Sequence, residues 1–224
     1  AEGISEEGKK SDSLEFSLMK TRLEVYYEKI PANALRFFQA KVNDSPSDAN
    51  IYGLALAHEK NGNFDKSLSL LNNLIEKYPK NLVINTTKVD VLLSNDEFKR
   101  ALTLVDRFLE ISPKNYPLSI SKSKVLLAME RYFESEEIIR DQLLRRNDDP
   151  ELWLLLSEIQ RSSQNIIGYH QSRAEYFLLL GQDEQALNQL EFALQLTQNN
   201  FQVSESIMNK IVKIKKDLSN SRGL

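Results

Sequence analysis

One His-Glu pair in the chain has a spacing close to that of a zinc protease. In the stretch LALAHEKNGNF, residues 54–64, His58 and Glu59 match the first two residues of the signature H-E-x-x-H. That signature works because two imidazoles one helical turn apart bind zinc while the glutamate acts as general base. Here Gly62 occupies the position of the second imidazole. The motif is incomplete, and the sequence predicts no metal-ligating pair at this place.

The remaining side chains offer little other chemistry. The chain has no cysteine, which excludes disulfides, thiolate nucleophiles and cysteine-based zinc sites, and its second histidine, His170, is far away in the sequence. It contains no Gly-rich phosphate loop, no G-x-S-x-G elbow and no acidic calcium loop. We therefore expect no catalytic residue, no cofactor-binding residue and no metal ligand, and so no cofactor, in these 224 residues.

Composition and charge narrow the class of protein. The chain is 41% hydrophobic and 27% charged, as expected for a folded protein with a substantial core. Its net charge of -3 provides no excess of cations for a phosphate backbone, so nucleic acid is not expected as a partner. No apolar run approaches the roughly 18 to 20 residues that cross a bilayer. The polar start without Met favours a soluble piece, processed or excised from something larger.

The main signal in the sequence is an internal repeat. Phe64, Phe98, Tyr132 and Ile166 follow one another at intervals of 34 residues, the period of tetratricopeptide repeats. Three residues after each of the first three comes a small residue, where two helices approach closely: Ser67, Ala101 and Ser135. Pro46, Pro79 and Pro113 stand at the ends of units, where proline stops a helix.

These features predict an all-α fold, an α-solenoid of about five tetratricopeptide-like helix pairs with roughly twelve helices. We expect a flexible tail over residues 1–12, the helical repeat domain over 13–219 and a flexible C-terminus over 220–224. The helix near 165–180 is expected to serve two units, because the next small residue, Ala186, comes half a unit early. The expected helices are 13–28, 32–43, 47–61, 64–77, 81–94, 97–110, 115–130, 132–145, 150–163, 165–180, 183–196 and 200–219.

The repeat also places the His-Glu pair. It lies at the end of the first helix of a unit, where His58 takes the position of a large residue packed between helices. Gly62 suits the left-handed position that ends such a helix and turns the chain toward Phe64. We expect a partly buried structural histidine with no catalytic role.

Stacked helix pairs form an extended concave surface lined by the first helix of each unit, and such a surface binds other proteins. The mixture of side chains at the inward positions suits a polypeptide ligand, and ordinary solvated helix residues are the alternative for any one of them. These predicted groove residues are Tyr52, Leu56, Glu59, Thr86, Asp90, Ile120, Lys124, Leu154, Glu158 and Arg161.

Several segments go beyond the generic repeat. The segments NALRFFQAKV, YGLALAHEKNGNFDKSLSLL, RRNDDPELWLLLSEIQ and YHQSRAEYFLLLGQDEQALNQLEFALQL resemble the C-terminal tetratricopeptide region of beta-barrel assembly-enhancing proteases, the BepA-like zinc metalloproteases of the Gram-negative periplasm. The resemblance covers roughly residues 14–218 and is most specific in the last segment.

The resemblance implies a periplasmic protein in two parts: an N-terminal metalloprotease domain with H-E-x-x-H, and this helical region as its carrier of protein contacts. Zinc is then expected only in the missing protease domain, and no catalytic residue of the family has a counterpart in this chain. The implied partners are the outer-membrane assembly machinery, outer-membrane protein substrates and the protease domain itself.

Two other functions stay open. A free-standing tetratricopeptide adaptor or scaffold without any protease would have the same repeats. A hydrolase within this chain is the third hypothesis, and it is weak because no complete catalytic motif is present.

Overall fold

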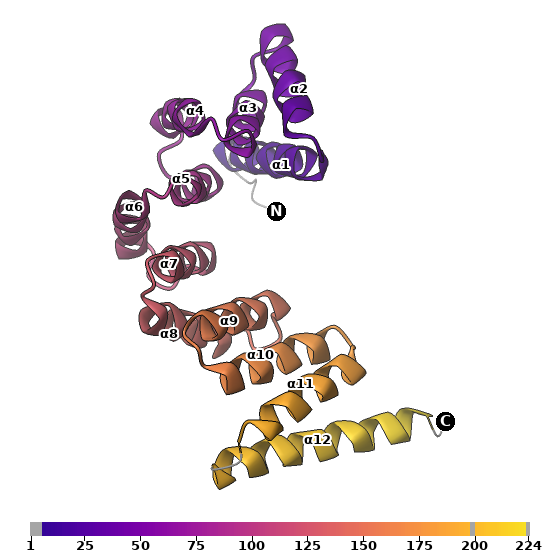
Figure 1. Cartoon of the computed structure of the whole chain (residues 1–224). Helices are drawn as coiled ribbons and strands as arrows, with labels where there is room; N and C mark the ends of the chain where they lie inside the picture. Colours follow the sequence, from indigo (N-terminus) through magenta and orange to yellow (C-terminus); the bar gives the residue numbers. More distant parts are fainter. Residues whose placement is uncertain (1–5, 198–199, 223–224) are drawn as a thin grey trace. The chain divides into compact units, whose positions relative to one another are not determined.

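The computed structural model describes residues 6–197 and 200–222, and side chains within 14–197 and 200–220. Regular structure in these ranges is entirely helical (Figure 1). None of the described helices combines the length and the apolar character needed to span a membrane. The helices are α1 (Glu6–Tyr27), α2 (Pro31–Asp44), α3 (Asp48–Lys60), α4 (Phe64–Lys77), α5 (Leu82–Ser94), α6 (Phe98–Ile111), α7 (Tyr116–Ala128), α8 (Tyr132–Leu143), α9 (Pro150–Ser162), α10 (Ile166–Leu179), α11 (Asp183–Gln195) and α12 (Phe201–Arg222).

The chain forms two compact units, Ala1–Ile111 with α1 to α6 and Ser112–Leu224 with α7 to α12. The twelve helices agree with the sequence prediction, and α2, α4 and α6 each end before the proline that was expected to stop them. The first helix begins earlier than predicted, at Glu6. Of the ends that were expected to be flexible, residues 1–5 and 223–224 lie outside the described residues, and the described remainder belongs to α1 and α12.

The helices α3, α5, α7 and α9, each the first of a pair, begin at a polar capping side chain. Ser47 accepts a hydrogen bond from the backbone N–H of Asn50 at the start of α3, and Asn81 accepts one from Ile84 at the start of α5. Asn115 and Asp149 cap α7 and α9 in the same way. Because such a side chain satisfies a backbone donor that the helix itself leaves unpaired, these four residues determine where each pair begins.

The turn inside each pair uses a left-handed residue at a fixed place. Gly62, Asp96, Glu130 and Gln164 all have positive φ, between 57° and 72°, and each lies two residues before the first residue of α4, α6, α8 or α10. Only the first of the four is glycine, which adopts this conformation without steric cost. The turn is therefore dictated by the repeat geometry, and three of the four sites carry a side chain that opposes it.

The pairs stack through close approaches at small residues. In the first unit, a Cβ added at Gly53 of α3 would overlap the Phe38 ring of α2 and lie 2.6 Å from Thr21 Cγ2 of α1. The predicted small residues Ser67, Ala101 and Ser135 are all fully buried. These positions confirm that the sequence repeat marks helix-helix contacts.

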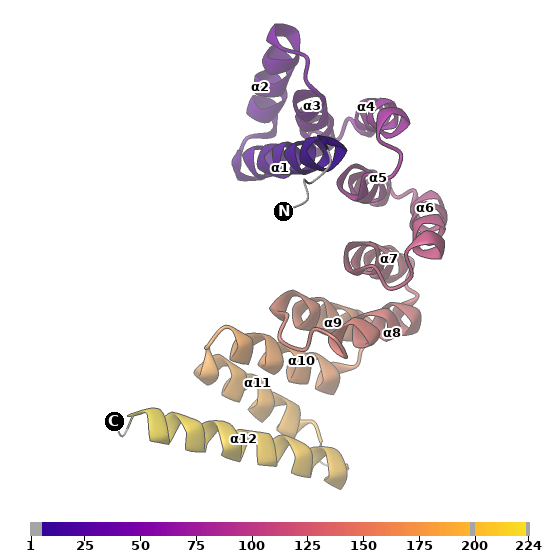
Figure 2. The same cartoon turned by 180° about the vertical axis from the view of Figure 1, so that it is seen from behind.

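The second unit has two apolar clusters. One joins α8 to α9 through residues such as Ile139, Leu152 and Ile159, and the other joins α10, α11 and α12 through Ala174 and Leu190. The helix α10 packs against both α9 and α11, as several other helices pack against both of their neighbours, and a role of this helix in two repeat units stays a prediction. Figure 2 shows these helices from the opposite side.

Glycine should stabilise the protein at the left-handed turn positions that carry a side chain. Glu130→Gly and Gln164→Gly should each raise the free energy of unfolding by about 0.5–1 kcal/mol, because the steric cost removed exceeds the entropy that glycine adds. Chemical denaturation of the whole chain measures the change.

Two matched variants test the reason. Gly62→Ala should lower the free energy of unfolding by about 1 kcal/mol, since it adds a Cβ to a left-handed residue. Glu137→Gly, inside α8, should lower it by about the same amount. A loss of stability in Glu130→Gly would contradict the explanation.

Candidate functional site

The first unit contains a groove where α1 lies along α3 and α5. These contacts are visible in Figures 1 and 2, where α1 crosses beneath α3 beside α5. We refer to this hollow of about 400 Å³ as the α1–α3–α5 groove. It is lined by Arg22, Val25, Tyr26, Leu56, Glu59, Lys60, Phe64, Asp90 and Ser94.

Two cationic side chains hold α1 in place. Lys60 of α3 donates to the carbonyl oxygens of Val25 at 2.8 Å and Glu28 at 2.5 Å, at the C-terminal end of α1. A cation at this end also offsets the negative pole of the helix dipole. Arg22 of α1 forms an ion pair with Asp90 of α5, with 3.0 Å between guanidinium nitrogen and carboxylate oxygen. The position of α1 therefore depends on polar contacts to both neighbouring helices.

The groove has an unusual carboxyl group, that of Glu59. Burial raises its pKa above the usual value, and the negative charge of Asp90 raises it further. A hydrogen bond donated by Ser94 Oγ, at 3.2 Å, and the charge of Arg22 partly offset these effects. The carboxylate form of Glu59 is thus less well stabilised than that of an ordinary surface glutamate.

The predicted groove residues of the first unit divide into two sets. Leu56, Glu59 and Asp90 line the α1–α3–α5 groove as a group. Tyr52 and Thr86 do not face a partner: Tyr52 is fully buried, with its hydroxyl 2.8 Å from Thr87 Oγ1, and Thr86 is 8% exposed. Leu56 is itself only 6% exposed. The expected accessibility of Tyr52 and Thr86 is wrong, because the Tyr52 hydroxyl of α3 turns into a buried contact with Thr87 of α5 and the Thr86 hydroxyl bonds to carbonyl oxygens of its own helix.

In the second unit the predicted residues lie on α7 and α9. Lys124, Glu158 and Arg161 are exposed, whereas Ile120 and Leu154 are half-buried. Ile120 packs against the apolar cluster of α8 and α9. The three charged residues are accessible to a partner, and binding by any of them stays a prediction.

Several residues of the groove escaped the sequence analysis. Arg22, Val25 and Tyr26 come from α1, and Lys60, Phe64 and Ser94 come from helix ends. The register of the repeat is broken at the first unit, where Pro46 to Pro79 spans 33 residues instead of 34. Without that register, the face of α1 that meets α3 cannot be read from the repeat pattern.

The His-Glu pair takes the structural place that the repeat predicts. His58 is buried near the end of α3, and Gly62 turns the chain into α4. Burial lowers the pKa of the imidazole, and the charge of Lys66 adds to this effect. Among the described residues, no group of three His, Asp or Glu side chains is arranged to hold a metal ion.

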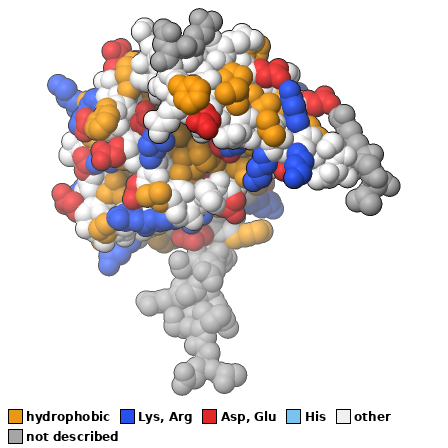
Figure 3. Space-filling model, turned by 90° about the horizontal axis from the view of Figure 1, so that it is seen from below, with side chains coloured by type: hydrophobic (Ala, Val, Ile, Leu, Met, Phe, Trp, Pro, Cys, Tyr) orange, Lys and Arg blue, Asp and Glu red, His pale blue; other side chains and the backbone are white. Residues whose placement is uncertain are grey.

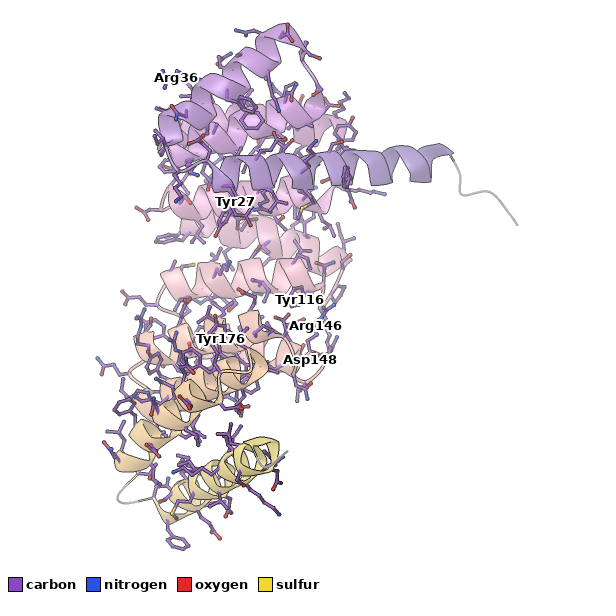
Figure 4. The ribbon with its side chains drawn as sticks, turned by 90° about the vertical axis from the view of Figure 1, so that its right-hand side faces the viewer. Tyr27, Arg36, Tyr116, Arg146, Asp148 and Tyr176 are labelled. Carbon is purple, nitrogen blue, oxygen red and sulfur yellow. The ribbon has the colours of Figure 1, made fainter. Side chains whose placement is uncertain are left out.

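Other polar clusters have a structural explanation. Tyr116 at the start of α7 donates to Asp149 Oδ2 at 2.6 Å, and the Arg146 guanidinium lies 4.4 Å from the tyrosine ring centre; Figure 4 labels Tyr116 and Arg146. Burial and the bond to Asp149 raise the pKa of Tyr116 to about 12. Because Asp149 is also the cap of α9, this cluster joins two helix starts.

A larger hollow, of about 560 Å³, lies between α1 and α2 near Tyr27 and Arg36, which Figure 4 also labels. None of the predicted groove residues lines it. The α1–α3–α5 groove is therefore the better candidate, since it joins predicted residues to charged and apolar walls.

A comparison with protein-family models matches residues 92–159 to the tetratricopeptide repeat. The matched segment runs from the end of α5 into α9. A comparison with curated proteins gives no match.

Solved structures with a similar fold include a tetratricopeptide repeat protein from Parabacteroides merdae, 14% identical, with a TM-score of 0.54 and coverage of 88% of this chain and 83% of that one. A thermophilic TPR protein of Thermus thermophilus is 17% identical, with a TM-score of 0.53 and coverage of 88% and 98%. MamA from Desulfovibrio magneticus, from its residue 41 to the end, is 12% identical, with a TM-score of 0.51 and coverage of 75% and 96%. At such low identity these likenesses concern the fold alone.

The comparisons give no link to beta-barrel assembly-enhancing proteases, and that narrower resemblance stays a prediction. They agree with the twelve described helices, which confirms the predicted fold class, an all-α solenoid of tetratricopeptide-like helix pairs. The family model identifies tetratricopeptide repeat sequence over residues 92–159, and the similar structures share the fold.

Proposed function

We propose that this chain is a protein-interaction domain whose first unit binds a polypeptide in the α1–α3–α5 groove. The observation that carries the proposal is the groove itself, an open hollow of about 400 Å³ with apolar and charged walls. A mixed lining of this kind suits a peptide, because apolar surface provides affinity and charged groups select the partner. Tetratricopeptide repeats typically serve protein-protein contacts through such surfaces.

The finer proposal is that the domain belongs to a periplasmic metalloprotease or chaperone of outer-membrane protein assembly and quality control. It rests on the sequence resemblance over residues 14–218. The implied partners are the barrel-assembly machinery, its substrate proteins and the protease domain. On the face that Figure 3 draws, side chains of both charge signs lie among apolar ones, which suits protein partners better than nucleic acid.

Photo-crosslinking in cells tests the interaction surface. A photoreactive phenylalanine at Tyr26, Lys124 or Arg161 should capture partner proteins, because these side chains are exposed at or near predicted binding positions. The same probe at Asn73 on α4 or Glu137 on α8 serves as the control. Capture from the control positions with none from Tyr26 would remove the α1–α3–α5 groove from consideration, whereas Lys124 and Arg161 test the surface of the second unit.

The coding sequence upstream of Ala1 distinguishes the protease proposal from the free-standing adaptor. The protease proposal expects a signal peptide and an H-E-x-x-H domain there, whereas the free-standing adaptor expects a short start.

Metal analysis addresses the hydrolase hypothesis. We expect the purified chain to carry no stoichiometric zinc and to show no protease activity, since His58 is buried and its motif is incomplete. Tight zinc binding that His58→Ala abolishes would contradict this expectation.

A further inference from the structure

The apolar part of the α1–α3–α5 groove suits a long side chain. Its apolar lining comes from Val25 and Tyr26 of α1, Leu56 of α3 and Phe64 of α4. Tyr26 is 73% exposed, so its ring presents an apolar surface to the solvent side of the groove. A partner side chain with an aliphatic stem gains contact area here, as lysine and arginine do when their stems lie along apolar surfaces.

The charged lining of the groove has two acidic side chains, Glu59 and Asp90, and two basic ones, Arg22 and Lys60. Asp90 is neutralised by Arg22 at 3.0 Å, whereas Glu59 receives a hydrogen bond from the neutral Ser94 hydroxyl and takes part in no ion pair among the described residues. The nearby cation Lys60 is engaged with the carbonyl oxygens of α1. The groove thus retains one negative charge, at Glu59, that a partner can neutralise.

We propose that the α1–α3–α5 groove binds a lysine or arginine side chain of a partner polypeptide, with the stem between Tyr26 and Leu56 and the cationic head at Glu59. This inference rests on the proposed function, peptide binding by the first unit, and adds the chemical class of the ligand. An acidic peptide segment is rejected by the same charge, since like charges brought together in a partly buried site repel.

The environment of Glu59 supports this choice of ligand. Its carboxylate is poorly stabilised by the chain because burial and Asp90 raise its pKa. A bound cation supplies the missing stabilisation and lowers the pKa again, so binding and deprotonation of Glu59 are coupled. The charged groups that line the groove with it are Arg22 of α1, Lys60 of α3 and Asp90 of α5.

Binding of short peptides to the whole chain tests the inference. The probes are three peptides Gly-Phe-X-Gly-Gly with blocked termini, in which X is lysine, norleucine or glutamate, so that they differ at one side chain. We expect the lysine peptide to bind about tenfold more tightly than the norleucine peptide, and the glutamate peptide most weakly. Backbone amide shifts in NMR spectra should change at Leu56, Glu59 and Ser94.

Glu59→Gln is the matched variant, because it removes the charge and keeps the shape. It should abolish the preference for lysine over norleucine, whereas Glu76→Gln, at an exposed position of α4, should keep it. Glu59→Gln should not melt below the parent chain at neutral pH. The raised pKa of Glu59 means that folding disfavours its carboxylate form, which lowers the free energy of unfolding at pH values above the ordinary pKa of 4.5. The uncharged amide of the Glu59→Gln variant does not have this unfavourable contribution.

Lowering the pH gives a second readout. Affinity for the lysine peptide should fall as the pH decreases from 7 toward 4.5, because Glu59 takes up a proton above the ordinary glutamate pKa of 4.5. In Glu59→Gln this pH dependence should disappear. His58 on the same helix also titrates, but it is present in both chains, so the difference between them isolates Glu59.

The outcomes separate the inference from the proposed function. Equal binding of the lysine and norleucine peptides, or a lysine preference that survives in Glu59→Gln, overturns the inference. If Tyr26, Lys124 and Arg161 nevertheless crosslink to partner proteins in cells, the proposed function stands without it. If no peptide binds and no crosslink to a partner protein forms, both the inference and the proposed function are wrong.

Discussion

No helix pair of this chain buries its apolar face alone, and each depends on the neighbouring pair for its core. The close approach at Gly53 shows the constraint most directly, because α3 lies so near α1 and α2 that a single methyl group would overlap the Phe38 ring. In α7 and α8 the same constraint places two serines in contact, Ser123 and Ser135, whose hydroxyl oxygens are 2.9 Å apart. Small residues at such contacts allow the backbones to approach, and the hydroxyls of Ser123 and Ser135 remain hydrogen-bonded after burial.

The repeat geometry also overrides local preference at the turns. Glu130 and Gln164 adopt a left-handed backbone that opposes their side chains, because only that conformation leads α7 into α8 and α9 into α10. The free-energy cost of this backbone strain is offset by the apolar contacts of the helices on both sides of the turn. The same argument explains why the residue two positions before Phe98 or Tyr132 need not be glycine for the fold to form.

Polar contacts decide the character of the first unit's surface. Arg22 and Lys60 hold α1 against α3 and α5, and their hydrogen-bond partners are Asp90 and carbonyl oxygens near the end of α1 instead of Glu59. The groove is therefore a consequence of how α1 is held: the cations that could neutralise Glu59 are engaged elsewhere, while burial and Asp90 raise its pKa. A half-buried carboxylate beside the exposed ring of Tyr26 is a surface on which a cationic partner gains both contact area and charge neutralisation.

The sequence by itself determined the twelve helices, the turns between them and the small residues at their contacts, because capping, the 34-residue period and proline stops are local signals. It also placed Leu56, Glu59 and Asp90 at one inward-facing surface. Only the tertiary structure decided that Tyr52 is fully buried against Thr87, and that Arg22 and Tyr26 help form the groove. The face that a helix presents to distant helices depends on contacts such as Arg22 with Asp90, which join residues 68 positions apart and leave no periodic pattern in the sequence.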